Sequence, residues 1–142
     1  FWLKMQRHFD ASERKRVGIV EALLQIQIPG PTAARLDEIC DRVRDHYGVK
    51  AAMISVIAPD GNHYVSKSGM DVSHSPAQRT GYSFCHYGYR RKLAVVILDA
   101  QEDERFATNA LVVGPPHIRF YAGQPIDYMT SQGPAFLGCL GI

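Results

Sequence analysis

The order of its segments is the feature that most constrains how this chain can fold. Residues 13–24 carry apolar side chains on one helical face, namely Val17, Val20, Leu23 and Leu24. The Pro-Gly-Pro sequence at 29–31 breaks this pattern, and apolar residues then recur at helical spacing up to Tyr47 and Gly48. The sequence therefore predicts two amphipathic helices, the second of which ends at the glycine.

Short, largely apolar runs follow these helices. Residues 51–58 and 63–68 flank a Pro-Asp-Gly-Asn turn and predict a β-hairpin. Further strands are predicted at 93–98, 117–123 and 135–142, with a loop after Gly69, a second loop over 99–109, and no clear pattern at 82–89. Two helices that precede an antiparallel sheet indicate an α+β layer rather than a doubly wound parallel fold.

Length and composition limit the classes of function. A chain of 142 residues corresponds to one domain. Its net charge of +2, with basic and acidic residues interleaved, argues against a nucleic-acid groove. The apolar runs are too short to span a bilayer, so no membrane insertion is expected. Three cysteines without a CxxC pair indicate a reducing, cytoplasmic location and give no zinc or other metal pattern.

Four segments carry a family resemblance: SFC at 83–85, VVILDAQEDERFATNALV at 95–112, HIRFYAGQPI at 117–126 and LGCLGI at 137–142. Together they resemble GAF domains of the subfamily found with histidine kinases and diguanylate cyclases. In that subfamily one strand leads into a motif that here corresponds to Asp99, Asp103, Arg105, Phe106 and Asn109. The resemblance extends over residues 1–142 and predicts a single GAF domain. Because the subfamily usually continues into a long final helix, we expect an excised part of a larger signalling protein that lacks this helix.

The resemblance implies a GAF/PAS-like fold, in which N-terminal helices cover one face of a central antiparallel sheet of about five to six strands. Pocket-forming loops lie on the other face, here 69–89 and 99–116. The implied ligand-pocket candidates are Ser83, Phe84, Cys85, His86, Asp99, Arg105, Phe106, Asn109, Arg119 and Tyr121. Arginine side chains can bind an anion through two hydrogen bonds. The alternatives are that Arg105 pairs with Asp99 or Asp103, that Arg119 points outward, and that the aromatic residues are core.

The resemblance further implies a non-catalytic regulatory sensor. Such a module binds an unidentified small molecule, controls an attached signalling effector and dimerises through its terminal helices; the resemblance specifies no cofactor. One alternative is a dimerisation or protein-interaction module without a ligand. Another is a free methionine sulfoxide reductase, which needs a low-pKa thiolate and a second thiol within reach.

The cysteine and basic residues also have simpler interpretations. Cys85 is expected to be a small buried side chain. The Cys-His pair that holds a tetrapyrrole in phytochrome-type GAF domains lies later in the chain, so chromophore attachment at Cys85 is not expected. The basic runs at 14–16 and 90–92 are interpreted as solvated surface. With no Ser-His-Asp or HExxH pattern, the chain is not expected to be an enzyme.

Overall fold

Two helices open the part of the chain that the computed structural model describes, which comprises residues 10–71, 74–76 and 83–142. Helix α2 spans Ala11–Gln25 and begins at Asp10, whose carboxylate accepts a hydrogen bond from the backbone N–H of Glu13. Helix α3 spans Gly30–Tyr47 and ends at Gly48, which adopts a left-handed φ of 63°. Both predicted helices are therefore present.

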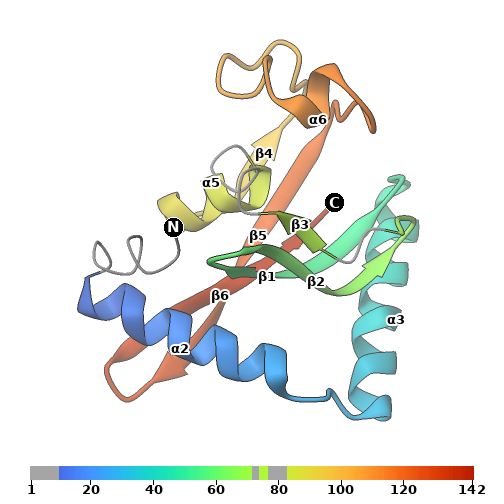
Figure 1. Cartoon of the computed structure of the whole chain (residues 1–142). Helices are drawn as coiled ribbons and strands as arrows, with labels where there is room; N and C mark the ends of the chain where they lie inside the picture. Colours follow the sequence, from blue (N-terminus) through green and yellow to red (C-terminus); the bar gives the residue numbers. More distant parts are fainter. Residues whose placement is uncertain (1–9, 72–73, 77–82) are drawn as a thin grey trace.

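The strands form one antiparallel sheet in the order β3-β2-β1-β6-β5-β4. Their bounds are Ala52–Ala58 for β1, Gly61–Ser68 for β2, His74–Pro76 for β3, Val95–Ile97 for β4, Tyr121–Thr130 for β5 and Gly133–Gly141 for β6. Figure 1 shows α2 below this sheet, α3 upright at its right-hand side and the short helix α5 above it. The predicted α+β fold, with N-terminal helices on one face of an antiparallel sheet, is confirmed.

Several predicted segments differ in detail from the structure. Residues without a clear pattern form α5, Phe84–Arg91, and a short helix α6, Ala110–Val113, follows the second loop. Strand β5 begins at Tyr121 rather than at residue 117, because the backbone of Ile118 bonds to Leu111 and the carbonyl of Arg119 accepts from Ala100. The chain before Tyr121 therefore holds the 99–116 loop instead of extending the sheet.

The side chains of the middle strands point alternately to the two helical layers. Ser66 of β2 pairs with Ile54 of β1 and contacts α3, whereas Ser55, the next residue of β1, pairs with Cys139 and contacts the α5 side. The main hydrophobic core lies on the α5 side and contains Ile57, Phe84, Cys85, Val95, Ile97, Ala100, Phe106, Val112, Tyr121, Phe136 and Cys139. The α5 side is thus the side on which the sequence places its pocket candidates.

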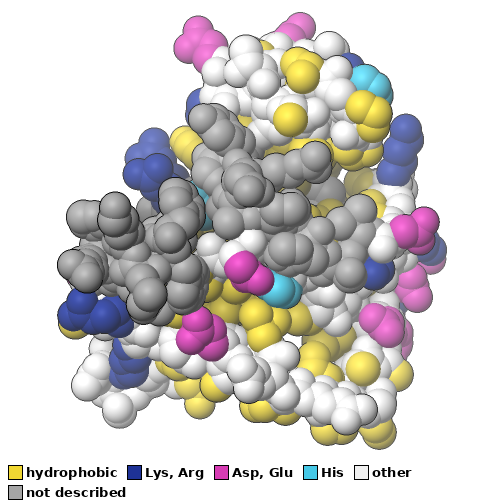
Figure 2. Space-filling model, in the orientation of Figure 1, with side chains coloured by type: hydrophobic (Ala, Val, Ile, Leu, Met, Phe, Trp, Pro, Cys, Tyr) yellow, Lys and Arg dark blue, Asp and Glu magenta, His cyan; other side chains and the backbone are white. Residues whose placement is uncertain are grey.

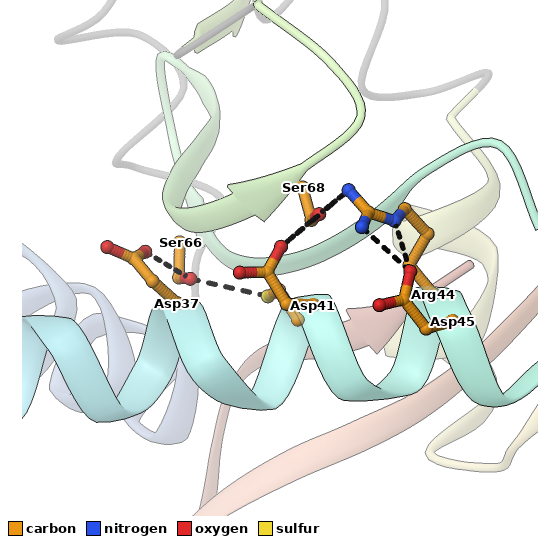
Figure 3. A network of polar contacts seen from close by, with 7 residues as sticks. Asp37, Asp41, Arg44, Asp45, Ser66 and Ser68 are labelled. Atoms are coloured by element: carbon orange, nitrogen blue, oxygen red, sulfur yellow. Dashed lines mark hydrogen bonds and ion pairs between the residues drawn. The ribbon is translucent and has the colours of Figure 1, made fainter.

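Helix α3 is held to β2 by a row of polar contacts rather than by an apolar interface alone (Figure 3). The Ser66 hydroxyl donates to Asp37 at 2.7 Å and contacts the thiol of Cys40 at 3.3 Å. The Ser68 hydroxyl donates to Asp41 and accepts from Arg44 at 2.6 Å. Because each strand serine finds a partner on the helix, two buried hydroxyl groups cost little to bury. The α3 side of β2 therefore serves to hold the helix on the sheet.

Candidate functional site

Helix α5 positions the first group of candidate residues over the sheet. Ser83 caps the helix by accepting a hydrogen bond from the backbone N–H of His86 at 3.1 Å. The Ser83 hydroxyl also accepts one from the side-chain amide of Asn62 on β2 at 3.3 Å. Helix α5 ends at Lys92, which has a left-handed conformation. The helix start is thereby fixed to the sheet by a buried polar contact.

An aromatic stack fills the space beneath α5. The ring of Phe84 lies 4.4 Å from that of Phe106 and 5.0 Å from that of Tyr121, and both pairs are stacked. A Cβ at Gly123 would lie 2.3 Å from the Tyr121 hydroxyl, so the glycine is needed for the Tyr121 ring to cross the sheet. All three aromatic side chains are buried, and they form core in the described structure.

Two thiols meet at the hydroxyl end of Tyr121. The hydroxyl lies 3.3 Å from the sulfur of Cys85, to which it donates, and 3.5 Å from the sulfur of Cys139. Ser55 contacts the Cys139 sulfur at 3.3 Å. Both cysteines are buried. The centre therefore contains two thiols and two hydroxyl groups from α5, β1, β5 and β6.

The interactions within this centre separate the acidities of the two thiols. The hydrogen bond with Cys85 is the largest cause that lowers the pKa of Cys139, to about 7; burial opposes it, and Ser55 and Tyr121 add to the lowering. The same pairing, with burial, raises the pKa of Cys85 well above its usual value. Burial also raises the pKa of Tyr121, so its hydroxyl stays protonated and available as a donor. These effects favour the thiolate at Cys139 over the thiolate at Cys85.

Two buried polar atoms near the start of α5 have no hydrogen-bond partner in the described structure: Oδ1 of Asn62 and Nδ1 of His86. The Asn62 side chain is almost fully buried. Burial is the main cause that lowers the pKa of His86, and the nearby Arg90 and Arg16 lower it further. The imidazole is therefore neutral near pH 7 and can donate or accept a hydrogen bond.

The polar candidate residues of the 99–116 loop form most of their hydrogen bonds and ion pairs within the loop. Arg105 forms an ion pair with Asp103 and lies 4.7 Å above the ring of Tyr87, as in the local alternative for this arginine. Asp99 accepts from the backbone N–H of Gln101, and Asn109 caps α6. Arg119 is half-buried and donates to the carbonyls of Val112 and Ile118, both at 3.0 Å, instead of pointing outward.

One buried charged cluster was not apparent from the sequence. Arg16, placed by its pattern on a solvated surface, is 6% exposed and donates to the Ile57 carbonyl at 2.6 Å. The interpretation of Arg16 as solvated is wrong because β1 pairs with β6 only up to Val56, which leaves this carbonyl to the arginine. Arg16 also binds Glu13 through two hydrogen bonds and lies 4.8 Å above the ring of Tyr89, whose hydroxyl donates to Glu13. The cluster joins α2 to α5.

Neither of two hollows in the described surface is lined by a predicted pocket residue. A groove of about 300 Å³ runs between α2, the end of α5 and the β5–β6 turn, and a shallower hollow of about 580 Å³ lies beside the end of α2. The predicted pocket between 69–89 and 99–116 falls partly on residues 72–73 and 77–82, outside the described residues. Its ligand-binding role stays a prediction.

Other features are absent from the described residues. They contain no group of three metal-ligating side chains. None of the helices in this part of the chain is both long and apolar enough to cross a membrane.

Comparison with known proteins decides the family. The family model of the GAF domain matches residues 31–140. The chain belongs to the GAF domain family. Over 97 residues it is 32% identical to a cyclic di-GMP phosphodiesterase of Pseudomonas aeruginosa; the match covers 68% of this chain and 16% of that protein. The GAF domain thus spans about a sixth of its curated relative.

Solved structures share the GAF fold at low identity. The GAF domain of a phosphoenolpyruvate-protein phosphotransferase from Acinetobacter has a TM-score of 0.56 and 16% identity, over 94% of this chain and 77% of that one. A free methionine-R-sulfoxide reductase from Neisseria meningitidis has a TM-score of 0.57 and 14% identity, over 94% of this chain and 74% of that one. At such identity the likeness shows the fold alone.

The sequence identified some of the residues that meet in this GAF domain and missed others. It selected Phe84, Cys85 and Tyr121, which the structure brings together between α5 and the sheet, and Ser83, which caps α5 and contacts Asn62. It missed Ser55 and Asn62, since a polar residue in a strand carries no sign of whether it faces a core or solvent. The pairing of both with the α5 side follows only from the strand register.

Proposed function

We propose that this GAF domain is a non-catalytic regulatory module that binds a small ligand and controls an attached effector of cyclic di-GMP signalling. The observation that carries the proposal is the similarity to a cyclic di-GMP phosphodiesterase, which is confined to a sixth of that protein. A segment this small within a larger enzyme is suited to regulation of the remainder. We further propose that the effector lies in the same polypeptide and that the protein is cytoplasmic.

Helix α5 is the element through which a ligand would act. Its first turn carries the His86 nitrogen and lies against the Asn62 oxygen, neither of which has a hydrogen-bond partner among the described residues. Its last turn carries Tyr89, which contacts α2. A ligand that satisfies the two polar atoms favours one position of α5 over another. Ligand binding shifts a regulatory equilibrium only through such differential affinity.

The experiment uses the full-length protein that carries this domain. Native mass spectrometry of the purified protein identifies a co-purifying small molecule, which is then titrated while cyclic di-GMP turnover is measured. We expect Asn62→Leu to weaken ligand retention, whereas Tyr128→Phe, at an exposed site on β5, retains it. Absence of a bound molecule contradicts ligand sensing, and cyclic di-GMP turnover that is insensitive to removal of the domain contradicts regulation.

A dimerisation module without a ligand is the second candidate function. Apolar side chains are exposed on or beside the N-terminal helices, including Leu23 on α2, Ile26 directly after α2 and Ile39 on α3. Figure 2 shows hydrophobic side chains at the surface between these helices. An exposed apolar surface favours association. Sedimentation of the full-length protein tests this role: a monomer at micromolar concentration, with ligand-dependent turnover, contradicts it.

A further inference from the structure

Two of the three cysteines are brought together from distant parts of the sequence. Cys85 lies on α5 and Cys139 on β6, and both sulfurs lie within 3.5 Å of the Tyr121 hydroxyl oxygen. Cys40 lies on α3, where it contacts Ser66 of β2. The chain therefore has one thiol pair and one separate thiol that is equally buried.

We propose that Cys85 and Cys139 form a reversible disulfide, which hydroperoxides generate and dithiols reduce. The proposal rests on the geometry of the two thiols and stands whether or not a ligand binds to the GAF domain. It differs from a sulfoxide reductase, because the oxidant is a peroxide and the product is the modified domain itself.

The surroundings of Cys139 suit it as the first sulfur to react. The hydroxyl groups of Ser55 and Tyr121 and the thiol of Cys85 surround its sulfur, and a thiolate is the nucleophile in such oxidations. With hydrogen peroxide, the Cys139 thiolate attacks one peroxide oxygen, the O–O bond breaks, and Cys139 becomes a sulfenic acid while hydroxide leaves. The hydroxide takes up a proton and leaves as water.

Cys85 is then placed to complete the disulfide. The hydrogen bond with the Cys139 thiol is the largest cause that raises the pKa of Cys85. Conversion of Cys139 to a neutral sulfenic acid removes this hydrogen bond and its effect on the pKa of Cys85. The Cys85 sulfur attacks the Cys139 sulfur, the S–O bond breaks, and a second water forms. In total two thiols lose two electrons and two protons, and one hydroperoxide is reduced.

Burial sets the class of oxidant. Cys85 is 5% exposed and Cys139 is 2% exposed, so a small oxidant reaches them more readily than a bulky disulfide does. The new bond would link α5 directly to β6. The disulfide would therefore fix α5, the helix proposed to respond to a ligand, to the sheet.

The test is thiol counting on the folded protein after treatment with hydrogen peroxide. Alkylation under denaturing conditions, followed by mass spectrometry, should show that two thiols are lost together and return with dithiothreitol. Peptide mapping should assign the cross-link to Cys85 and Cys139. Cys40→Ser is the matched control and should form the same cross-link, whereas Cys85→Ser should stop Cys139 at a sulfenic acid, which dimedone traps.

A second variant tests the role of the centre without removing a thiol. Tyr121→Phe keeps the aromatic stack and removes the hydroxyl group that contacts both sulfurs, so the disulfide should form about fivefold more slowly at neutral pH. Circular dichroism establishes that each variant is folded. Cross-links to Cys40, irreversible oxidation of each cysteine separately, or no thiol loss in folded wild-type protein would each overturn the proposal.

Discussion

Replacement of Arg16 by methionine should destabilise the domain through the polar groups that it leaves behind. The Arg16 side chain is 7% exposed and its partner Glu13 is 21% exposed. Methionine preserves much of the packing of the aliphatic stem and removes the guanidinium. The Ile57 carbonyl then loses its donor, and among the described side chains the Glu13 carboxylate keeps the hydroxyl of Tyr89.

The expected size follows from these two stranded groups. An unsatisfied buried carbonyl costs about 1–3 kcal/mol, and a partly buried carboxylate that loses its cation costs about 1–2 kcal/mol after allowance for its contact with solvent. Arg16→Met should therefore lower the free energy of unfolding by about 2–5 kcal/mol. A double variant that also carries Glu13→Gln should lose about 1 kcal/mol less than the sum of the single changes, because no charge is stranded.

Urea denaturation followed by far-ultraviolet circular dichroism measures these free energies. Arg42→Met is the matched control, because Arg42 is 80% exposed and lies 3.7 Å from Glu38 on the surface of α3. This control should change the free energy of unfolding by less than about 0.5 kcal/mol. If Arg16→Met proves no more destabilising than Arg42→Met, the buried cluster between α2 and α5 does not contribute as argued.

Three further predictions concern separate parts of the fold. Gly18→Ala should stabilise α2 by up to about 1 kcal/mol, because no described atom lies within 4 Å of the added methyl group. Gly138→Ala should instead prevent folding, because its Cβ would lie 1.7 Å from a carbonyl oxygen of β1. Soluble yield and thermal melting of the two variants test this contrast. Phe84→Ala should cost about 3–5 kcal/mol in urea denaturation, against less than about 1 kcal/mol for Phe120→Ala, whose side chain is half exposed. Burial lowers the pKa of His86 in the folded state, so the unfolded chain binds its proton first and stability should fall as the pH drops below 6.5; urea midpoints at about pH 7.5 and 5.5 should differ less in His86→Gln.

The helices and the first hairpin could be predicted because local signals specify them. The sequence shows the helical spacing of α2, the glycine that ends α3 and the turn that joins β1 to β2. Helix α5 has no comparable signal, since a glycine interrupts its sequence FCHYGYRR and the stabilising contacts come from the sheet. Strand β5 continues through Pro125 because β4 pairs only with residues 121–123, so Pro125 lies on an open edge where proline is tolerated.

The candidate site could be predicted only in the parts that a family motif contains. The motif identified Phe84, Phe106 and Tyr121, but whether they bind a ligand or one another depends on ring positions that no spacing specifies. Loop residues such as Arg105 were ambiguous for a related reason. An arginine two positions from Asp103 can pair locally or bind an anion, and the structure shows the local pair.

The connection between α2 and α5 bears on how a domain with a well-packed core could still respond to a signal. Closely packed side chains resist gradual deformation, so a response requires an element with two discrete positions. Helix α5 is short, and separate polar contacts hold its two ends, at Ser83 and at Tyr89. A change at its first turn, whether a ligand at Asn62 and His86 or a bond between Cys85 and Cys139, would therefore alter the contact of Tyr89 with Glu13 in the first turn of α2. If α5 moves as proposed, the aromatic core would be its pivot, and the cluster at Arg16 would connect it to the N-terminal helix.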